Sequence, residues 1–361
     1  MSHRNCINLW WGIGLFIAWC LLFAGCNNKS SKGSLFGATG QPLETVVVIP
    51  DGYDTPTLRE KVSKALGAPM SILPQEEPLL SLMFVSEQNF SQMFKSMRNV
   101  LFLTIDSTQY TRPSVGVSRD VYASGQLLLH ARAADLDGLY KLLDKRGDEL
   151  GRIVHREELR RISMNFEKTY SSNVAKLVEE TIDGYTINVT NNLEFTSVAE
   201  DFVWASDQGQ KGRTDLLVYT YPYEGLESLE ASRIIAARDS VLRRHVPGSF
   251  EGSYMVTEAR IDPVVRAYKY GGNDGVELRG LWRMEGDMMG GPYVLHAFKD
   301  ESNHRVVVSE VLVYNPGGKK KKLMLVAEAQ LCTLRPINTS FDGIWATQSE
   351  EEANNEEVNA H

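Results

Sequence analysis

The stretch "VELRGLWRME", from Val276 to Glu285, has the clearest pattern in the sequence. Its residues fall into two alternating sets. The first set is Val276, Leu278, Gly280, Trp282 and Met284, and the second is Glu277, Arg279, Leu281, Arg283 and Glu285. Side chains of a β-strand point alternately to opposite faces, so this period of two predicts a strand with one buried face.

A hairpin and a closing helix are predicted after this strand. Residues 293–299 and 304–314 are expected to pair around the polar sequence "DESN" at 300–303. Further apolar residues recur at helical spacing: Leu323, Val326, Ala327, Leu331 and Leu334. We therefore expect a helix, not a strand, in this last apolar segment.

Upstream, short apolar strands alternate with helices. Strands are expected at 44–50, 78–85, 99–105, 125–133, 185–189, 201–206 and 215–221. Helices are expected after Thr55 with Pro56 in the first turn, from Ser86 through Met97, and from Ser228 to about Arg244. The segment 135–183 is predicted to be mostly helical and to connect two halves.

This order of elements predicts an α+β fold, with layered sheets, packed helices and two related halves joined by a helical connector. The expected division begins with a signal peptide at 1–25 and a flexible tether at 26–43. An N-terminal half with the connector at 44–183, a C-terminal half at 184–336 and an acidic tail at 337–361 follow. The tail contains "SEEEANNEEVNAH" and is predicted to be disordered.

The first 25 residues have the parts of a secretory signal. Arg4 is the only charged side chain before Cys26, and the run from Leu9 to Gly25 is uncharged and largely apolar. Small residues, Ala24 and Gly25, end the run, as at a signal-peptide cleavage site. The run is slightly short for a permanent membrane span, which needs about 18 apolar residues.

The sequence "FAGC", ending at Cys26, resembles a bacterial lipobox, in which the cysteine is acylated and becomes the new N-terminus. Phe23 stands where lipoproteins usually carry Leu. A non-lipidated signal and an uncleaved N-terminal helix are the alternatives. The following residues are rich in Ser, Gly and Asn, which is typical of a tether that forms no core.

The charge and the cysteine content of the chain bear on whether it binds nucleic acid and whether disulfides stabilise it. The chain has 38 basic and 46 acidic residues. Without Arg4, 37 basic residues remain and the formal charge is −9, so nucleic acid is not an expected partner. Cleavage before Cys26 and its acylation leave Cys332 as the single free cysteine, which predicts a fold without an internal disulfide.

Two longer segments carry a resemblance. They are "YPYEGLESLEASRIIAARDSVLRRHVPGSFEGSYMVTE" at 221–258 and "RGLWRMEGDMMGGPYVLHAF" at 279–298. Over about residues 46–335 the chain resembles a family of uncharacterised lipoproteins of the Bacteroidota built around a domain of unknown function. The resemblance implies a place in the cell envelope and supplies no activity and no catalytic residues. Surface-exported lipoproteins of this group usually carry acids after the cysteine, and "CNNKSSKGS" has none, which implies an outer-membrane anchor facing the periplasm.

Signatures of catalysis and cofactor binding are absent from the sequence. It has no G-x-S-x-G elbow, no Ser-x-x-Lys and no phosphate-binding loop. The histidines form no His-x-x-x-His pair, so neither a metal site nor a cofactor is predicted. The carboxylate pairs Glu76-Glu77, Glu157-Glu158 and Glu179-Glu180 are interpreted as solvated faces.

Two groups of residues are candidates for binding. Tyr219, Tyr221 and Tyr223 recur at every second position, which predicts either a packed aromatic stripe, the favoured interpretation, or a platform for a glycan or peptide. The second group is Arg279, Trp282, Arg283 and Tyr293. Here the two arginines are expected on the outer face, beside a Met-Met-Gly-Gly loop, where they could hold an anionic ligand or an acidic partner. The alternative is a half-buried strand with exposed arginines and a tight turn, and it is the favoured interpretation.

The sequence therefore predicts a lipid-anchored envelope protein that acts by binding, as an adaptor or ligand-holding module. The expected partners are the membrane, through the lipid on Cys26, and an envelope protein or anionic ligand. A periplasmic hydrolase with catalytic residues dispersed along the chain is the alternative. A structure can separate the two, because a hydrolase needs a nucleophile, a base and an orienting acid within hydrogen-bond reach.

Overall fold

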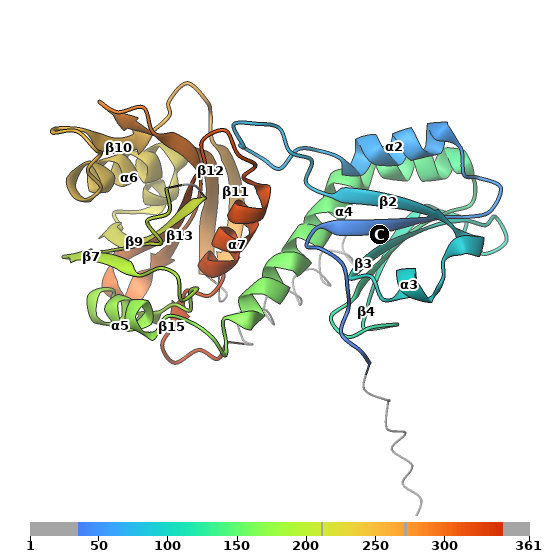
Figure 1. The fold of residues 1–361 in the computed structure, drawn as a ribbon, viewed down its shortest axis with the longest axis horizontal. Helices are drawn as coiled ribbons and strands as arrows, with labels where there is room; N and C mark the ends of the chain where they lie inside the picture. The colour runs from blue at the N-terminus through green and yellow to red at the C-terminus, as the bar shows by residue number, and fades with distance from the viewer. Residues whose placement is uncertain (1–34, 211, 271–272, 342–361) are drawn as a thin grey trace, which may run out of the picture.

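The computed structural model describes residues 35–210, 212–270 and 273–341. Cys26 and the segment before it, and most of the acidic tail, lie outside the described residues. The α+β class is confirmed. Figure 1 shows two halves, each with its own sheet, joined by the long helix α4 (Leu136–Asn165), which spans about 45 Å at 1.5 Å per residue.

The N-terminal half is built on a five-stranded sheet with the order β2-β1-β3-β5-β4. Its strands are β1 (Glu44–Ile49), β2 (Ser81–Ser86), β3 (Asn99–Ile105), β4 (Ser114–Arg119) and β5 (Leu127–Ala133). All neighbours run parallel except β4, which pairs antiparallel with β5 at one edge. The sequence analysis located four of these strands and missed β4, whose "SVGVSR" has little apolar content.

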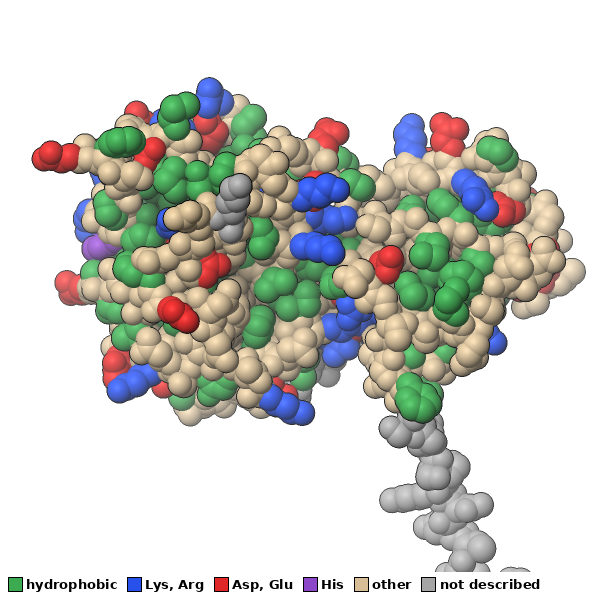
Figure 2. All heavy atoms as spheres, in the orientation of Figure 1, with side chains coloured by type: hydrophobic (Ala, Val, Ile, Leu, Met, Phe, Trp, Pro, Cys, Tyr) green, Lys and Arg blue, Asp and Glu red, His purple; other side chains and the backbone are tan. Residues whose placement is uncertain are grey.

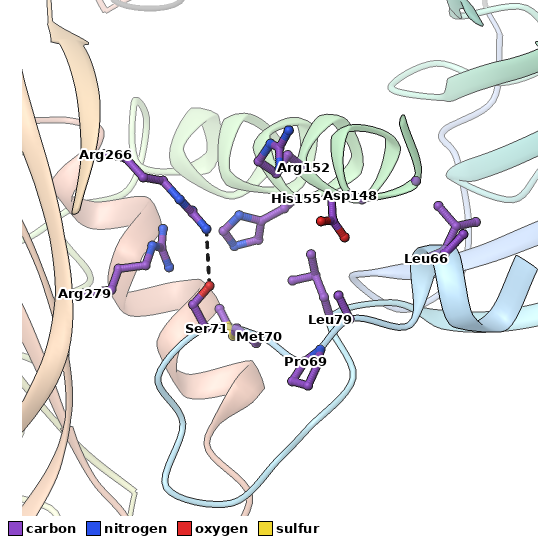
Figure 3. Close-up of a pocket in the computed structure, with 14 residues that line it drawn as sticks. Leu66, Pro69, Met70, Ser71, Leu79, Asp148, Arg152, His155, Arg266 and Arg279 are labelled. Carbon is purple, nitrogen blue, oxygen red and sulfur yellow. Dashed lines mark hydrogen bonds between the residues drawn. The ribbon is translucent and has the colours of Figure 1, made fainter. Parts of the chain in front are cut away.

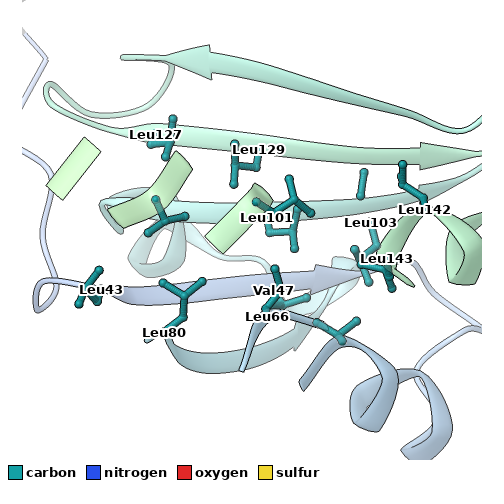
Figure 4. Packing of buried hydrophobic residues seen from close by; sticks show 14 of the residues in the cluster. Leu43, Val47, Leu66, Leu80, Leu101, Leu103, Leu127, Leu129, Leu142 and Leu143 are labelled. Carbon is teal, nitrogen blue, oxygen red and sulfur yellow. The ribbon is translucent and has the colours of Figure 1, made fainter. Parts of the chain in front are cut away.

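Helices α2 (Pro56–Leu66) and α4 cover one face of this sheet. The Thr55 hydroxyl accepts the Leu58 backbone N–H at 3.2 Å, so the predicted cap is confirmed. Leucines and valines from the sheet and both helices form the core shown in Figure 4. The two helices approach closely, because a Cβ at Gly147 would lie 2.6 Å from the Ala65 carbonyl oxygen.

Within the described chain, only short helical segments pack on the opposite face of this sheet. The helix predicted from Ser86 to Met97 is wrong, since the structure has a short 3-10 turn, η1 (Glu87–Asn89), and one helical turn, α3 (Gln92–Lys95). Phe90 takes a non-helical conformation between them, which lets it pack edge-on against Phe102 of β3. Tertiary packing of the aromatic rings has thus overridden the helical spacing.

The described end of the predicted tether is bound to this half. Backbone N–H groups of Ala38 and Thr39 donate to the carbonyls of Ser124 and Ser96, both at 2.8 Å, and Leu43 is buried in the core. The expectation of a flexible tether through Leu43 is therefore wrong for its last residues, because their backbone groups are paired within the domain.

The C-terminal half contains an eight-stranded antiparallel sheet with the order β10-β12-β13-β14-β9-β8-β7, and β11 also pairs with β12. Its strands are β7 (Phe195–Ala199), β8 (Phe202–Ser206), β9 (Arg213–Pro222), β10 (Tyr254–Thr257), β11 (Val264–Tyr270), β12 (Asn273–Glu285), β13 (Gly290–Asp300) and β14 (Arg305–Tyr314). The predicted strand and hairpin at β12 to β14 are confirmed. The two halves are not related in topology, contrary to expectation, because one sheet is mostly parallel and the other antiparallel.

Helices cover both faces of this larger sheet. The predicted closing helix is confirmed as α7 (Lys321–Leu331), which shares a core with α5 (Ser172–Thr181) on one face. Helix α6 (Ala231–His245) covers the other face and begins three residues after Ser228, which lies in the 3-10 turn η2 (Leu226–Leu229). Because α5 packs in this core, it belongs with the C-terminal half, so the boundary between the halves lies before Ser172 and not at 183 as expected.

A short two-stranded sheet closes the described chain. β6 (Tyr185–Thr186) pairs with β15 (Arg335–Pro336), so the strand expected at 185–189 is shorter than predicted. Residues 337–341 of the predicted tail stay bonded to this corner, where the Ile337 N–H donates to the Gly184 carbonyl and Phe341 is buried. Among the described residues, no helix has the length and apolar content that a bilayer crossing requires.

The halves are held together by the packing of α4 against α7 and by the segment 67–80, which we call the docking loop. It connects α2 to β2 and lies against the C-terminal half, where Met70 enters the core of the larger sheet. The Glu77 carboxylate accepts the backbone N–H groups of Lys320 at 2.6 Å and Lys321 at 3.1 Å. Glu77 thus caps α7 from the other half of the molecule, in place of the side-chain cap that Lys320 lacks.

Candidate functional site

A cavity of about 170 Å³ lies where the docking loop, α4, β11 and β12 meet (Figure 3). Its lining combines small and apolar residues near α2 with charged residues from α4 and the sheet. The lining residues are Ala65, Leu66, Ala68, Pro69, Met70, Ser71, Leu79, Gly147, Asp148, Gly151, Arg152, His155, Arg266 and Arg279. Both halves contribute to this wall, so the site exists only when the docking loop is in place.

The charged lining is mainly basic. Three guanidinium groups, those of Arg152, Arg266 and Arg279, reach the cavity wall, against the single carboxylate of Asp148. Within the described part of the chain, Arg152 has no hydrogen bond or ion pair. Arg266 is held weakly, with Nη2 donating to Ser71 Oγ at 3.3 Å and Nη1 lying 3.4 Å from Glu277 Oε1. Two cationic groups are therefore available to a ligand.

Arg279 is different, because it is the centre of a buried ion-pair network. It donates to Glu277 of its own strand at 2.8 and 3.0 Å, and to both carboxylate oxygens of Glu328 on α7. Burial alone disfavours the charged guanidinium, but Glu328 and Glu277 outweigh it and raise the pKa of Arg279. Burial likewise opposes ionisation of Glu328, yet Arg279 and His155 lower its pKa to about 2.

Two histidines flank this network. His155 Nε2 of α4 lies 3.5 Å from Glu328, and His296 Nε2 of β13 lies 3.4 Å from Glu277. The His296 ring also stacks on Tyr268, with centroids 3.9 Å apart. A continuous polar path therefore runs from the cavity wall at His155 into the sheet.

The structure corrects the site predicted around β12. The expectation that Arg279 and Arg283 share an exposed face is wrong for Arg279, which is 4 % exposed because α7 covers that face. Arg283 is half-exposed and pairs with Glu285 at 2.7 Å. Trp282 and Tyr293 are buried on the opposite face, where the Tyr293 ring lies 4.0 Å below the Arg238 guanidinium. These four residues do not form one binding surface.

The three tyrosines form a packed stripe and no platform. Tyr219 is buried and donates to Glu310 at 3.3 Å, while Tyr221 donates to the Ser228 carbonyl at 2.7 Å. Tyr223 packs against the same core, with the Lys299 ammonium 5.2 Å from its ring. Burial raises the pKa of both Tyr219 and Tyr221, as for phenols removed from water. The packed-stripe interpretation is confirmed.

The interpretation of Glu157 and Glu158 as a solvated pair is wrong. Both are buried on α4, where Glu157 pairs with Arg160 at 2.6 Å and Glu158 with Arg161 at 2.8 Å. Glu158 also accepts from Asn99 Nδ2 at 2.8 Å, which fixes α4 to the edge of β3. Glu77 is buried as well, as the cap of α7. These acids hold elements together, which fits their pairing and burial.

Apart from Arg279, which was expected on an exposed face, the lining residues were missed by sequence reasoning because they come from four distant segments. Arg152 and His155 are three apart on α4 and so share a helix face, which is the only local signal. Nothing in the sequence brings Arg266 near Ser71, 195 positions away. The docking loop could have been suspected from its Met, Ile and Leu residues, which are unusual in an exposed connection.

Neither the hydroxyl in the cavity nor the buried thiol of Cys332 has the contacts that activate a nucleophile within the described residues. Ser71 is the one hydroxyl in the described lining of the cavity, and it accepts a hydrogen bond from the Arg266 guanidinium, which cannot act as a base. Cys332 is buried and free, and burial raises the pKa of its thiol, so little of the reactive thiolate forms. No group of three or more His, Cys, Asp or Glu suited to a metal occurs in the described residues.

Comparisons with known proteins agree with the division into halves. Residues 38–167 match the family model described as "Domain of unknown function (DUF8532)", and residues 171–333 match "Domain of unknown function (DUF4837)". The two matches meet between α4 and α5 and support a family built around domains of unknown function. No curated protein matches the chain. The crystal structure of the Saccharomyces cerevisiae Ran-binding protein Mog1p is similar at 10 % identity, covering 44 % of this chain and 93 % of its own, with a TM-score of 0.26.

Proposed function

We propose that this protein is a lipid-anchored component of the cell envelope that binds a small oxyanion, without transforming it, in the cavity between its halves. The observation that carries the ligand class is the pair of available guanidinium groups, Arg152 and Arg266, facing a space with one carboxylate. Guanidinium groups hold carboxylates and phosphates through paired N–H donors, which is the usual basis of such recognition.

The size of the cavity limits the ligand. A site of about 170 Å³ is smaller than the 300–1,000 Å³ of pockets for drug-sized molecules. It is close to an engineered cavity of about 150 Å³ that holds benzene, so a ligand of about five to eight non-hydrogen atoms would fit. Inorganic phosphate and short mono- or dicarboxylates meet both the size and the charge.

The position of the cavity between the halves means that a bound ligand could also link them. Because the docking loop, α4 and β11 all line the site, a ligand bound there contacts both halves. Any ligand that binds only the folded, closed arrangement stabilises it, by an amount that grows with the ligand concentration. Binding should therefore reduce motion between the halves as well as fill the cavity.

Calorimetric titration of the full chain with phosphate and with succinate tests the ligand site. We expect single-site binding that weakens about tenfold in Arg152→Gln and in Arg266→Gln, because a hydrogen bond to a charged group contributes about 1.5–3 kcal/mol. Arg283→Gln is the matched control, since Arg283 is paired at the surface outside the cavity. Absence of heat with both probes, or an equal loss in the control, would contradict the proposal.

The proposed anchor rests on the sequence "FAGC" and the resemblance to envelope lipoproteins. We propose the outer membrane, facing the periplasm, as its location, because "CNNKSSKGS" has no acid after the cysteine. Labelled palmitate fed to the native host should enter the wild-type chain. Cys26→Ala should lose the label and appear in the soluble fraction. Equal labelling of the two chains would remove Cys26 from the proposal.

A further inference from the structure

Five exposed hydrophobic side chains gather where the described chain begins. They are Leu35, Phe36, Met93, Val121 and Tyr122, of which Phe36 is 92 % and Met93 67 % exposed. Figure 2 shows hydrophobic side chains at this lower end of the N-terminal half, next to the first described residues. Exposed apolar groups are ordinary when scattered, but a contiguous group around one point indicates an interaction surface.

Hydrogen bonds place these residues side by side. The Ser124 N–H donates to the Phe36 carbonyl at 2.8 Å, which sets residues 35–36 beside the loop that carries Val121 and Tyr122. Ser96 accepts from the Thr39 N–H at 2.8 Å and donates to the Met93 carbonyl at 2.9 Å, which brings the turn of α3 to the same point. Three segments far apart in the sequence thus build one patch.

The patch has the composition of a membrane–water interface. Tyrosine side chains are enriched at the level of lipid headgroups, and lysines contact anionic headgroups. The Lys95 ammonium lies 5.6 Å from the Tyr122 ring, at the edge of the patch. Lys29 and Lys32 also lie in the sequence between Cys26 and the patch. Aromatic, aliphatic and cationic groups therefore occur together here.

We propose that this patch rests on the lipid bilayer, so that the protein is held at the membrane by contact as well as by its lipid. The proposal rests on the proposed acylation of Cys26. Leu35 follows Cys26 by nine residues, which span at most about 30 Å, so the patch is the described surface closest along the chain to the anchor. The lipid of a lipobox cysteine has more than one acyl chain and holds the membrane stably by itself, so a second contact of this kind mainly fixes the orientation of the domain.

Photo-crosslinking to lipid tests this surface. The full chain, purified from host membranes, is placed in vesicles of phosphatidylethanolamine and phosphatidylglycerol that contain a diazirine phospholipid, and the modified peptides are identified by mass spectrometry. We expect the peptide containing Val121 and Tyr122 to be labelled at least fivefold more than the peptide containing Phe250. Phe250 and Met288 are also exposed hydrophobic residues, but they lie on loops of the C-terminal half.

Matched variants complete the test. Phe36→Ser with Met93→Ser should reduce labelling of the 121–122 peptide at least fivefold, whereas Phe250→Ser with Met288→Ser should leave it unchanged. Equal labelling of the two peptides in an acylated chain would overturn the patch. The mass of the Cys26 peptide reports acylation separately. Preferential labelling of the patch without acylation would retain the surface and overturn the anchor.

Discussion

Two buried arginines, on opposite faces of the same sheet, take part in ion pairs of similar geometry but different setting. Arg238 of α6 donates to Glu310 of β14 at 2.9 and 2.6 Å, and both side chains are completely buried. Arg279 of β12 pairs with Glu277 and Glu328, yet one side of it lines the cavity. The first network is enclosed within one half, and the second lies where the halves meet.

The contrast between the two networks separates arginines that hold elements of the fold in place from arginines that are available to a ligand. Arg238 also donates to Thr257 Oγ1 at 2.9 Å and lies over the Tyr293 ring, so its contacts are used within the protein. Arg279 is likewise satisfied by its carboxylates, but it holds Glu328, and so α7, against the sheet beside Arg152 and Arg266. Arg279 therefore positions the cavity wall, while its two neighbours remain open to an anion.

The largest expected effect on stability comes from a substitution that breaks the enclosed Arg238–Glu310 network. Arg238→Met leaves the Glu310 carboxylate buried without its partner, which costs about 3–5 kcal/mol in free energy of unfolding. Arg279→Met should cost less, because loss of that side chain opens the cavity to the carboxylates left behind. Urea unfolding measures both. Equal losses of unfolding free energy in the two variants would show that the cavity beside Arg279 does not reduce the cost of its removal.

The two networks should also differ in how their contribution to stability changes at acidic pH, because the pKa of Glu328 is lowered. Its folded pKa of about 2 lies below the ordinary 4.5, so its contribution to stability is present above pH 4.5 and is lost as the pH falls toward 2. A shift of this size corresponds to about 3 kcal/mol. Burial raises the pKa of Glu310, so Glu310 does not share this behaviour. Glu328→Gln should flatten the acid limb of a stability–pH curve, and Glu310→Gln should leave it in place.

A smaller effect is expected at the contact between halves. Glu77→Gln removes the negative charge at the N-terminus of α7, where Lys319 to Lys322 make the helix end strongly positive. Loss of such a cap and of its interaction with the helix dipole costs about 1 kcal/mol. Hydrogen exchange should rise at the first amides of α7, with Glu76→Gln as the control. Unchanged exchange would show that the docking loop is held by its apolar residues alone.

The smallest expected effect concerns Cys332. It is free and buried in the described structure, and no disulfide depends on it. Reductant should therefore shift the melting temperature by less than about 1 °C, a change too small to reflect loss of a disulfide, which typically contributes about 2–4 kcal/mol. A fall of several degrees would reveal an intermolecular bridge.

Much of the fold could be predicted because its strands and long helices obey local rules. The alternation in β12 and the Thr55–Pro56 start of α2 are local and were predicted. The turn from Phe90 to Met97 has equally good helical spacing, but its side chains pack better against the open sheet than along a helix. Strands β4, β7, β10 and β11 were missed, because each spans only four to seven residues and is defined by its pairing with a neighbouring strand.

The candidate site could not be predicted, since it depends on contacts between distant segments. The exposed position expected for Arg279 was wrong because alternation identifies two faces of a strand and does not say that a helix covers the second one. Helix α7 does so here and supplies Glu328. Arg266 and Ser71 meet only because the docking loop crosses from one half to the other.

The central claim is that the cavity between the halves holds a small oxyanion, and one measurement tests it most directly. Crystals of the protein grown with selenate, a tetrahedral oxyanion whose selenium scatters anomalously, would locate the anion in a difference map. The account predicts a peak in the cavity within hydrogen-bond distance of Arg152 and Arg266, about 2.7–3.2 Å for N–H donors. The peak should be absent when both residues are glutamine. A cavity without selenate at saturating concentration would contradict the claim.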